Sequence, residues 1–124
     1  MKLMETPERT AFCATYQRTV ELIGRRWTGA IVRALLSGVT RFSDLSETVP
    51  GLSDRMLAER LKELEAEGIV LRTVVPETPV RVEYSLTDKG RDLDGIIAAV
   101  ACWAERWGVE TVAEHTAETA ATVG

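Results

Sequence analysis

The chain has 124 residues, 45% hydrophobic and 27% charged, which is the composition of one ordinary globular domain. No apolar run approaches the roughly 20 residues that span a bilayer, and the polar N-terminus is unlike a signal or transit peptide. Two cysteines and one histidine are too few for a disulfide scaffold or a zinc site. We therefore expect a cytoplasmic protein that does not enter a membrane and that carries no metal or other cofactor.

The charge is unevenly distributed along the chain. The net charge of −4 argues against a nucleic-acid partner. However, residues 1–50 carry seven basic and five acidic side chains, residues 51–90 carry six and eight, and residues 91–124 carry two and six. The acid is concentrated at the C-terminal end, so a basic face in the first two thirds is compatible with the composition.

Helical spacing predicts three helices in the first part of the chain. Residues 13–24 and residues 25–38 each place apolar side chains on one side and end at a glycine. Thr28 is expected to cap the second of these helices. A short third helix is predicted over residues 43–48, before a Pro-Gly turn.

The fourth helix has the strongest local signals. Ser53 is a favourable N-cap, and Gly68 ends the helix. Leu57, Leu61 and Leu64 recur at positions i, i+4 and i+7 and form one apolar stripe. At about 100° per residue, the face opposite this stripe carries four side chains. They are Arg55, Glu59, Lys62 and Ala66.

The pattern then changes to that of strands. Residues 69–75 and 80–86 are rich in β-branched side chains and partly alternate, and the Pro-Glu-Thr-Pro segment between them indicates a hairpin with a stiff tip. Thr87 is expected to cap a single last helix that runs to residue 108. Residues 109–124 are predicted to be a frayed helix or a disordered tail.

These elements are typical of a winged helix-turn-helix domain, a mainly α fold with a small β-hairpin. We expect an N-terminal arm over residues 1–11, the winged domain with terminal dimerisation helices over residues 12–108, and the tail. In this architecture the helix that begins at Ser53 enters the DNA major groove, and its first turn touches base edges.

Four motifs occur in order and at characteristic distances. They are Ile23-Gly-x-x-Trp-Thr, Arg41-Phe-x-x-Leu, Leu57-x-x-Arg-Leu-x-x-Leu and Val82-Glu-Tyr-x-Leu-Thr-x-x-Gly. Over about residues 12–107 the chain resembles the HxlR family of bacterial winged helix-turn-helix transcriptional regulators. It departs from the common family pattern in having Arg25-Arg26 where Gly-Lys is usual, and Ala14 instead of proline after Cys13. The resemblance implies a homodimer that binds promoter pseudo-palindromes in double-stranded DNA.

The candidate DNA contacts fall into three groups. The base-reading candidates are Ser53, Asp54, Arg55, Ala58 and Glu59, and Lys62 is a further candidate DNA contact on this helix. The alternative is a solvated face with i,i+4 pairs such as Arg55–Glu59. The two acids would repel phosphates, although a carboxylate can accept from a cytosine amino group. Arg81 is the candidate wing contact, against an ordinary hairpin charge facing water. Candidate phosphate contacts near helix starts are Arg25, Arg26 and Arg41, against a role in solubility alone.

The last helix carries the candidate dimer interface. Together with Tyr16 in the first helix, its proposed interface residues are Leu93, Ile97, Val100, Trp103, Ala104 and Trp107. The alternatives are a core within one chain, or a pocket for a small-molecule effector lined by the two tryptophans.

Cys13 is a candidate sensor because, in some members of the resembled family, a cysteine at this place responds to oxidants or electrophiles. A helix N-terminus favours a thiolate, which is the reactive form. The alternative is a buried, inert cysteine, and Cys102 is expected to fit that description better.

The chain has no Gly-rich phosphate loop, no Ser/His/Asp set and no metal constellation, so we do not expect an enzyme. The main alternative to a DNA-binding regulator is a winged-helix module that binds other proteins, for which the acidic surface is the clue.

Overall fold

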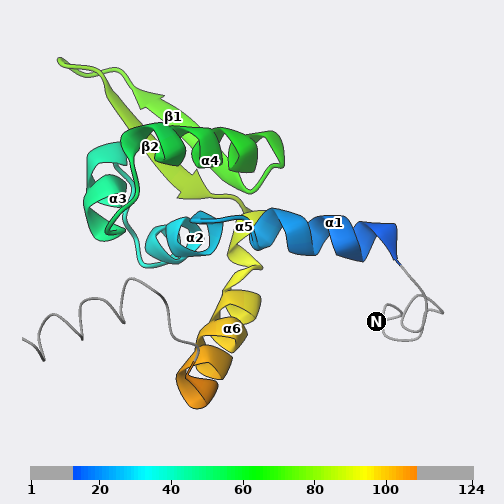
Figure 1. Cartoon of the computed structure of the whole chain (residues 1–124). Coiled ribbons are helices and arrows are strands. Elements are labelled where there is room, and N and C mark those ends of the chain that lie inside the picture. Colours follow the sequence, from blue (N-terminus) through cyan, green and yellow to red (C-terminus); the bar gives the residue numbers. More distant parts are fainter. Residues whose placement is uncertain (1–12, 109–124) are drawn as a thin grey trace, which may run out of the picture. The chain divides into compact units, whose positions relative to one another are not determined.

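The computed structural model describes residues 13–108; the expected arm over residues 1–11 and tail over residues 109–124 lie outside this range. The elements in chain order are α1 (Ala14–Ile23), α2 (Thr28–Leu36), α3 (Phe42–Thr48), α4 (Asp54–Ala66), β1 (Val70–Val75), β2 (Arg81–Leu86), α5 (Asp88–Arg91) and α6 (Asp94–Trp107) (Figure 1). They form two compact units, one ending at Asp92 and one beginning at Leu93. The predicted class, mainly α with one β-hairpin, is confirmed.

The core of the first unit lies among α2, α3, α4 and the base of the hairpin. α2 contacts α1, α3 and β2, and α4 contacts β1. The largest fully buried side chains are Ile31, Leu45, Leu57, Leu61, Leu64, Val32 and Thr28. α2, α3 and α4 therefore share one apolar core with the base of the hairpin.

Thr28 is not the cap of α2, which corrects the prediction. It is the first helical residue and is only 2% exposed, whereas Trp27 takes the cap position without a side-chain hydrogen bond. Trp27 has φ of 77°, a left-handed conformation that is uncommon for a residue other than glycine, in the turn between α1 and α2. The helix therefore starts one residue earlier than predicted, and the Thr28 side chain is buried in the core.

α4 has the predicted start and the predicted buried stripe. The Ser53 hydroxyl accepts a hydrogen bond from the Met56 N–H at 3.1 Å, as an N-cap does. Leu57, Leu61 and Leu64 are at most 1% exposed. This stripe fixes which face of α4 is left to solvent.

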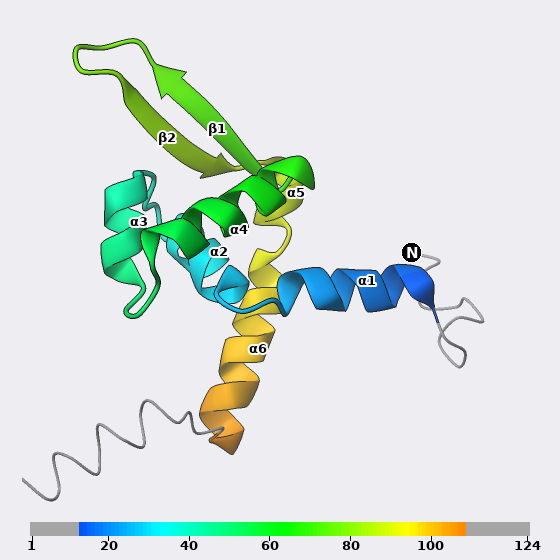
Figure 2. The same cartoon turned by 45° about the horizontal axis from the view of Figure 1, so that its top comes forward.

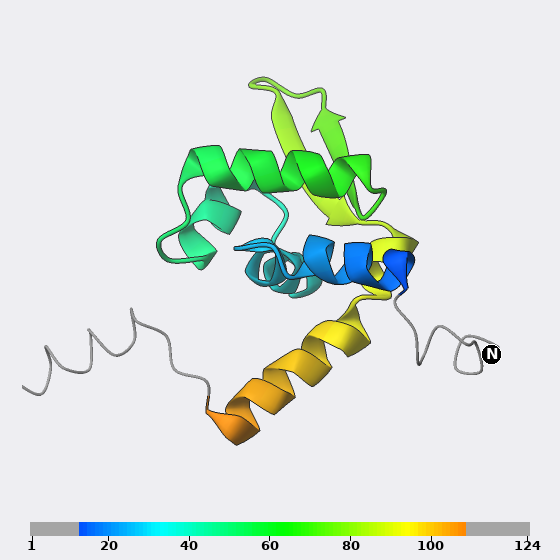
Figure 3. The same cartoon turned by 45° about the vertical axis from the view of Figure 1, so that its right-hand side comes forward.

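The hairpin is an antiparallel pair in the register Val70↔Leu86 to Val75↔Arg81. Only its base is buried, at Val70 and Leu86, and the tip projects past the helices (Figure 2 and Figure 3). The chain before α3 adds to the free edge of β2, because the Tyr84 N–H donates to the Thr40 carbonyl at 2.8 Å. This edge contact joins the β1–β2 hairpin, which is the wing of the winged helix-turn-helix fold, to the start of α3.

The predicted single helix after Thr87 is wrong, because it is interrupted at Asp92 and Leu93. Thr87 does act as a cap, but of the short α5, whose Lys89 Nζ donates to the Glu67 carbonyl at 2.7 Å. Gly90 packs so closely that a Cβ there would lie 2.3 Å from the Ile69 carbonyl oxygen. α5 is thus fixed to the end of α4 and to the base of the hairpin. The hydrophobic periodicity of the sequence does not predict these contacts.

α6 has no buried residue. Its most exposed apolar side chains recur at i, i+4, i+7 and i+11, and they are Ile96, Val100, Trp103 and Trp107. Leu93, Ile97 and Ala104 of the predicted seam are half-buried. Among the described residues, no helix is both long and apolar enough to traverse a bilayer.

Candidate nucleic-acid interface

Residues 53–62, at the cap and along the first part of α4, present an exposed and mostly polar face. All six candidate DNA contacts of this helix are exposed, namely Ser53, Asp54, Arg55, Ala58, Glu59 and Lys62. They lie away from the three buried leucines, so the core holds α4 while leaving this face free. The arrangement matches a helix that inserts its first turns into a groove.

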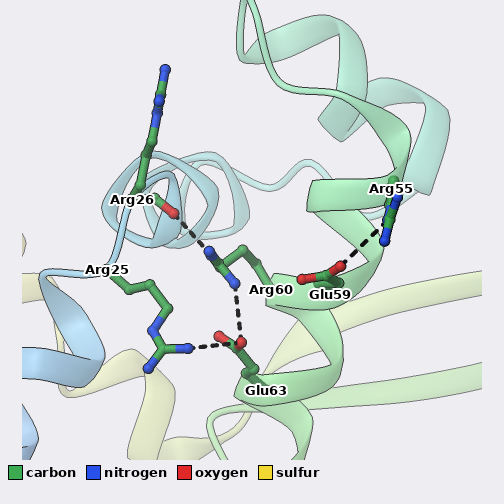
Figure 4. Close-up of polar contacts among 6 residues, drawn as sticks. All are labelled: Arg25, Arg26, Arg55, Glu59, Arg60 and Glu63. Atoms are coloured by element: carbon green, nitrogen blue, oxygen red, sulfur yellow. Dashed lines mark hydrogen bonds and ion pairs between the residues drawn. The ribbon is translucent and has the colours of Figure 1, made fainter.

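Arg55 and Glu59 form an exposed pair on this face. The Arg55 Nε lies 3.6 Å from Glu59 Oε2, and the side chains are 90% and 50% exposed (Figure 4). Such a pair is weak in water because solvent and salt screen it. The pair is therefore compatible with a DNA contact and with an ordinary solvated face, since a screened ion pair costs little to break.

Asp54 has a structural contact that the sequence did not indicate. Its Oδ1 accepts a hydrogen bond from the Ser46 hydroxyl at 2.8 Å, joining α3 to the first turn of α4. A carboxylate in the first turn is also favoured by the helix dipole. Asp54 thus helps to hold the start of α4 against α3.

Arg81 lies between two carboxylates at the start of β2. Its Nη1 is 2.7 Å from Glu77 Oε1 and its Nε is 2.8 Å from Glu83 Oε2, and its side chain is 30% exposed. Arg81 borders a groove of about 530 Å³ that also includes Arg41 and Pro79. Arg81, the candidate wing contact, is therefore paired with two acidic side chains. Arg72, exposed on β1, is a further wing cation that the sequence analysis missed.

Arg25 and Arg26 lie at the α1–α2 junction, beside the second half of α4. The Arg26 guanidinium carbon lies 4.8 Å from the centre of the Trp27 ring, a cation–π contact on an exposed side chain. Arg25 Nη1 lies 3.0 Å from Glu63 Oε2 (Figure 4). The candidate cations thus stand at separate places around α4 and the wing.

The two cysteines differ from what the sequence led us to expect. Cys13 is the N-cap of α1, is half-buried, and its Sγ accepts from the Tyr16 N–H at 3.4 Å. Cys102 is exposed, so its predicted burial is wrong; it stands on α6, which buries no residue. Within residues 13–108, no group of three His, Cys, Asp or Glu side chains is placed to hold a metal ion.

Comparison with known proteins identifies the family. Residues 22–112 match the HxlR-like helix-turn-helix family. The HTH-type transcriptional regulator YvaP of Bacillus subtilis is 48% identical over 99 residues, covering 80% of this chain and 92% of YvaP. The regulator YodB of the same organism is 45% identical over 95 residues, covering 77% of this chain and 85% of YodB.

Solved structures of YodB from B. subtilis have the same fold. Its reduced form aligns with a TM-score of 0.70 and 44% identity over 78% of this chain and 95% of that chain. Its diamide-treated form aligns with a TM-score of 0.68 and 43% identity, covering 81% and 99%. Its quinone-bound form gives 0.67 and 40%, covering 77% and 100%. The chain therefore belongs to the HxlR-like helix-turn-helix family, and it is a DNA-binding transcriptional regulator.

Proposed function

We propose that this regulator binds promoter pseudo-palindromes as a homodimer, with the first turns of α4 in the major groove and the wing against the DNA backbone. The observation that carries the proposal is the exposed polar face of α4, which begins at the Ser53 cap and lies opposite the buried leucines. Binding to the chromosome would place the protein in the cytoplasm.

Base reading is assigned to the exposed first half of α4. Arg55 has the reach and the donors to bind a guanine edge, and Glu59 can accept from a cytosine amino group one turn further on. Ser53, Ala58 and Lys62 complete the contact face. Because the Arg55–Glu59 pair is exposed, DNA competes only with a screened partner.

Affinity is assigned to cations around this helix, which would contact phosphates. Arg26, Arg41 and Arg72 are exposed and are the strongest candidates. Arg81 uses Nε and one Nη in its ion pairs, and a guanidinium has further N–H donors that remain for a phosphate. We expect binding to weaken steeply as salt rises, since counterions are released from the DNA.

The dimer interface is assigned to exposed apolar side chains on two helices. On α6 these include Val100, Trp103 and Trp107, and on α1 Tyr16 is 69% exposed. Large exposed aromatic side chains are characteristic anchors of interfaces. A two-fold dimer would present two copies of α4 to half-sites about one helical turn apart, roughly 34 Å.

Cys13 is proposed as the sensor of oxidants or electrophiles. The supports are its position as the N-cap of α1 and the similarity to YodB, which has been solved in diamide-treated and quinone-bound forms. The check is operator binding before and after diamide or a quinone. Wild type and Cys102→Ser should release DNA and Cys13→Ser should keep it. A Cys13→Ser variant that responds like wild type would remove Cys13 from this role.

The proposal of sequence-specific binding is tested by fluorescence anisotropy with duplexes from upstream of the gene and with a shuffled duplex of equal composition. We expect at least a roughly thousandfold preference for one upstream site, which is at the low end for specific regulators. Equal binding to both duplexes would contradict sequence-specific recognition.

A further inference from the structure

Glu63 joins two arginines on the flank of α4. Its Oε2 accepts from Arg25 Nη1 at 3.0 Å and from Arg60 Nη1 at 3.0 Å. The Arg60 Nε donates to the Arg26 carbonyl oxygen at 2.9 Å. Figure 4 shows the chain of contacts running from α4 to the α1–α2 junction. The cluster thus links residues that are far apart in sequence.

The flank position separates this cluster from both other faces of α4. At about 100° per residue, Arg60 and Glu63 lie between the buried leucines and the exposed face of Arg55 and Glu59. The Arg60 side chain is only 12% exposed, whereas that of Arg25 is 49% exposed. Arg60 is therefore shielded from solvent and from the groove-facing surface.

The charges make the cluster interdependent. Arg60 is largely removed from water, so it depends on the Glu63 carboxylate and the Arg26 carbonyl for partners. The bond to a main-chain oxygen fixes the backbone next to Trp27, which holds the left-handed conformation at this junction. A charge-assisted hydrogen bond to a fixed carbonyl restrains position more tightly than two mobile surface side chains do.

We propose that the Arg25–Glu63–Arg60 cluster is a brace that sets the position of α4 for base reading, and that Arg25 acts through Glu63 and not as a phosphate contact. This rests on the proposed use of α4 in DNA recognition. The second half of α4 is held at the junction, and the first half carries the base-reading face. A small tilt of the braced half would displace Arg55 from its base. Arg25, Arg60 and Glu63 are therefore positioning residues.

The brace and a simple charge effect predict opposite changes in operator affinity for Glu63→Gln. Removing an acid from a DNA-binding surface should strengthen binding through electrostatics alone. The brace predicts the reverse: a roughly tenfold loss of operator affinity, comparable to losing one base contact, with little change for a shuffled duplex. Glu65→Gln removes the same charge from the same helix outside the cluster, and it should not weaken operator binding.

Arg25→Ala and Arg26→Ala form a matched pair at the junction. If Arg25 acts through Glu63, Arg25→Ala lowers operator affinity without changing the slope of log K against log salt. Arg26→Ala, at an exposed candidate phosphate contact, should reduce that slope by about 0.9. Arg25 is half-exposed, so its variant keeps the test available if Glu63→Gln folds poorly.

A measurement without DNA separates the brace from the proposed function. In the free protein, the Arg60 Nε–H should exchange slowly with water by NMR, and Glu63→Gln should accelerate it while leaving the Arg55 Nε–H unchanged. Stronger operator binding by Glu63→Gln, a reduced salt slope for Arg25→Ala, or unaltered Arg60 exchange would each overturn the proposal. Absence of operator preference in wild type would instead count against the proposed function.

Discussion

α4 and α6 are helices of nearly equal length, with 13 and 14 residues, but they use their apolar sides differently. α4 buries three leucines to 1% exposure or less. α6 buries no residue and leaves Trp103 and Trp107 59% and 63% exposed. α4 buries its apolar stripe within its own chain, whereas the large apolar side chains of α6 stay exposed. We expect the first helix to determine stability and the second to determine association.

The largest effect is expected from the buried stripe of α4. Leu61→Ala should lower the free energy of unfolding by about 2–5 kcal/mol, because it removes buried methyl groups and leaves a cavity. Urea denaturation followed by circular dichroism measures this. Glu65→Ala on the exposed side is the control and should stay within about 0.5 kcal/mol of wild type. A Leu61→Ala loss as small as that of the control would show that α4 is not anchored as described.

The next largest effect is expected from the exposed aromatic side chains of α6. Replacing both Trp103 and Trp107 with alanine should weaken the dimer by about 2 kcal/mol or more, since such aromatic residues are typical interface hot spots. Sedimentation should show a shift toward monomer and loss of operator binding, with the helical signal retained. An unchanged dimer with a lowered unfolding midpoint would assign the two rings to packing within one chain. The proposed difference between α4 and α6 would then be wrong.

A smaller effect sharpens the difference between the two helix starts. α4 has a side-chain cap at Ser53, whereas the N-cap residue of α6, Leu93, makes no side-chain cap hydrogen bond. Ser53→Ala should cost about 1 kcal/mol of unfolding free energy, because the Met56 N–H loses its partner. Thermal denaturation of the variant, with Ser53→Asp as the conservative replacement, checks this. Destabilisation by Ser53→Asp equal to that of Ser53→Ala would argue against a capping role.

The features of the fold that could be predicted from the sequence are local ones. The Ser53 cap and the Leu57, Leu61 and Leu64 stripe follow from residues within a few turns of each other, and the structure confirms both. The same periodicity also identified the exposed side of α4. Patterns of this kind can be predicted because helix geometry alone determines which residues share a face.

Features that depend on tertiary contacts could not be predicted from the sequence. Thr28 was a plausible cap until the turn at Trp27 placed it in the core. Cys102 was expected to be buried, but α6 provides no buried site within one chain. The Arg60 bond to the Arg26 carbonyl joins positions that have no common local pattern. Such contacts depend on how distant helices meet, which neither propensity nor spacing encodes.

The central claim is that the exposed first half of α4 reads DNA. The most direct measurement is selection from a pool of random duplexes by wild type, Arg55→Ala and Glu65→Ala, followed by sequencing. We predict that wild type and Glu65→Ala enrich the same pseudo-palindrome with half-sites about one helical turn apart, and that Arg55→Ala loses preference at one symmetric pair of positions. No enriched sequence with wild type, or an unchanged motif with Arg55→Ala, would contradict the account.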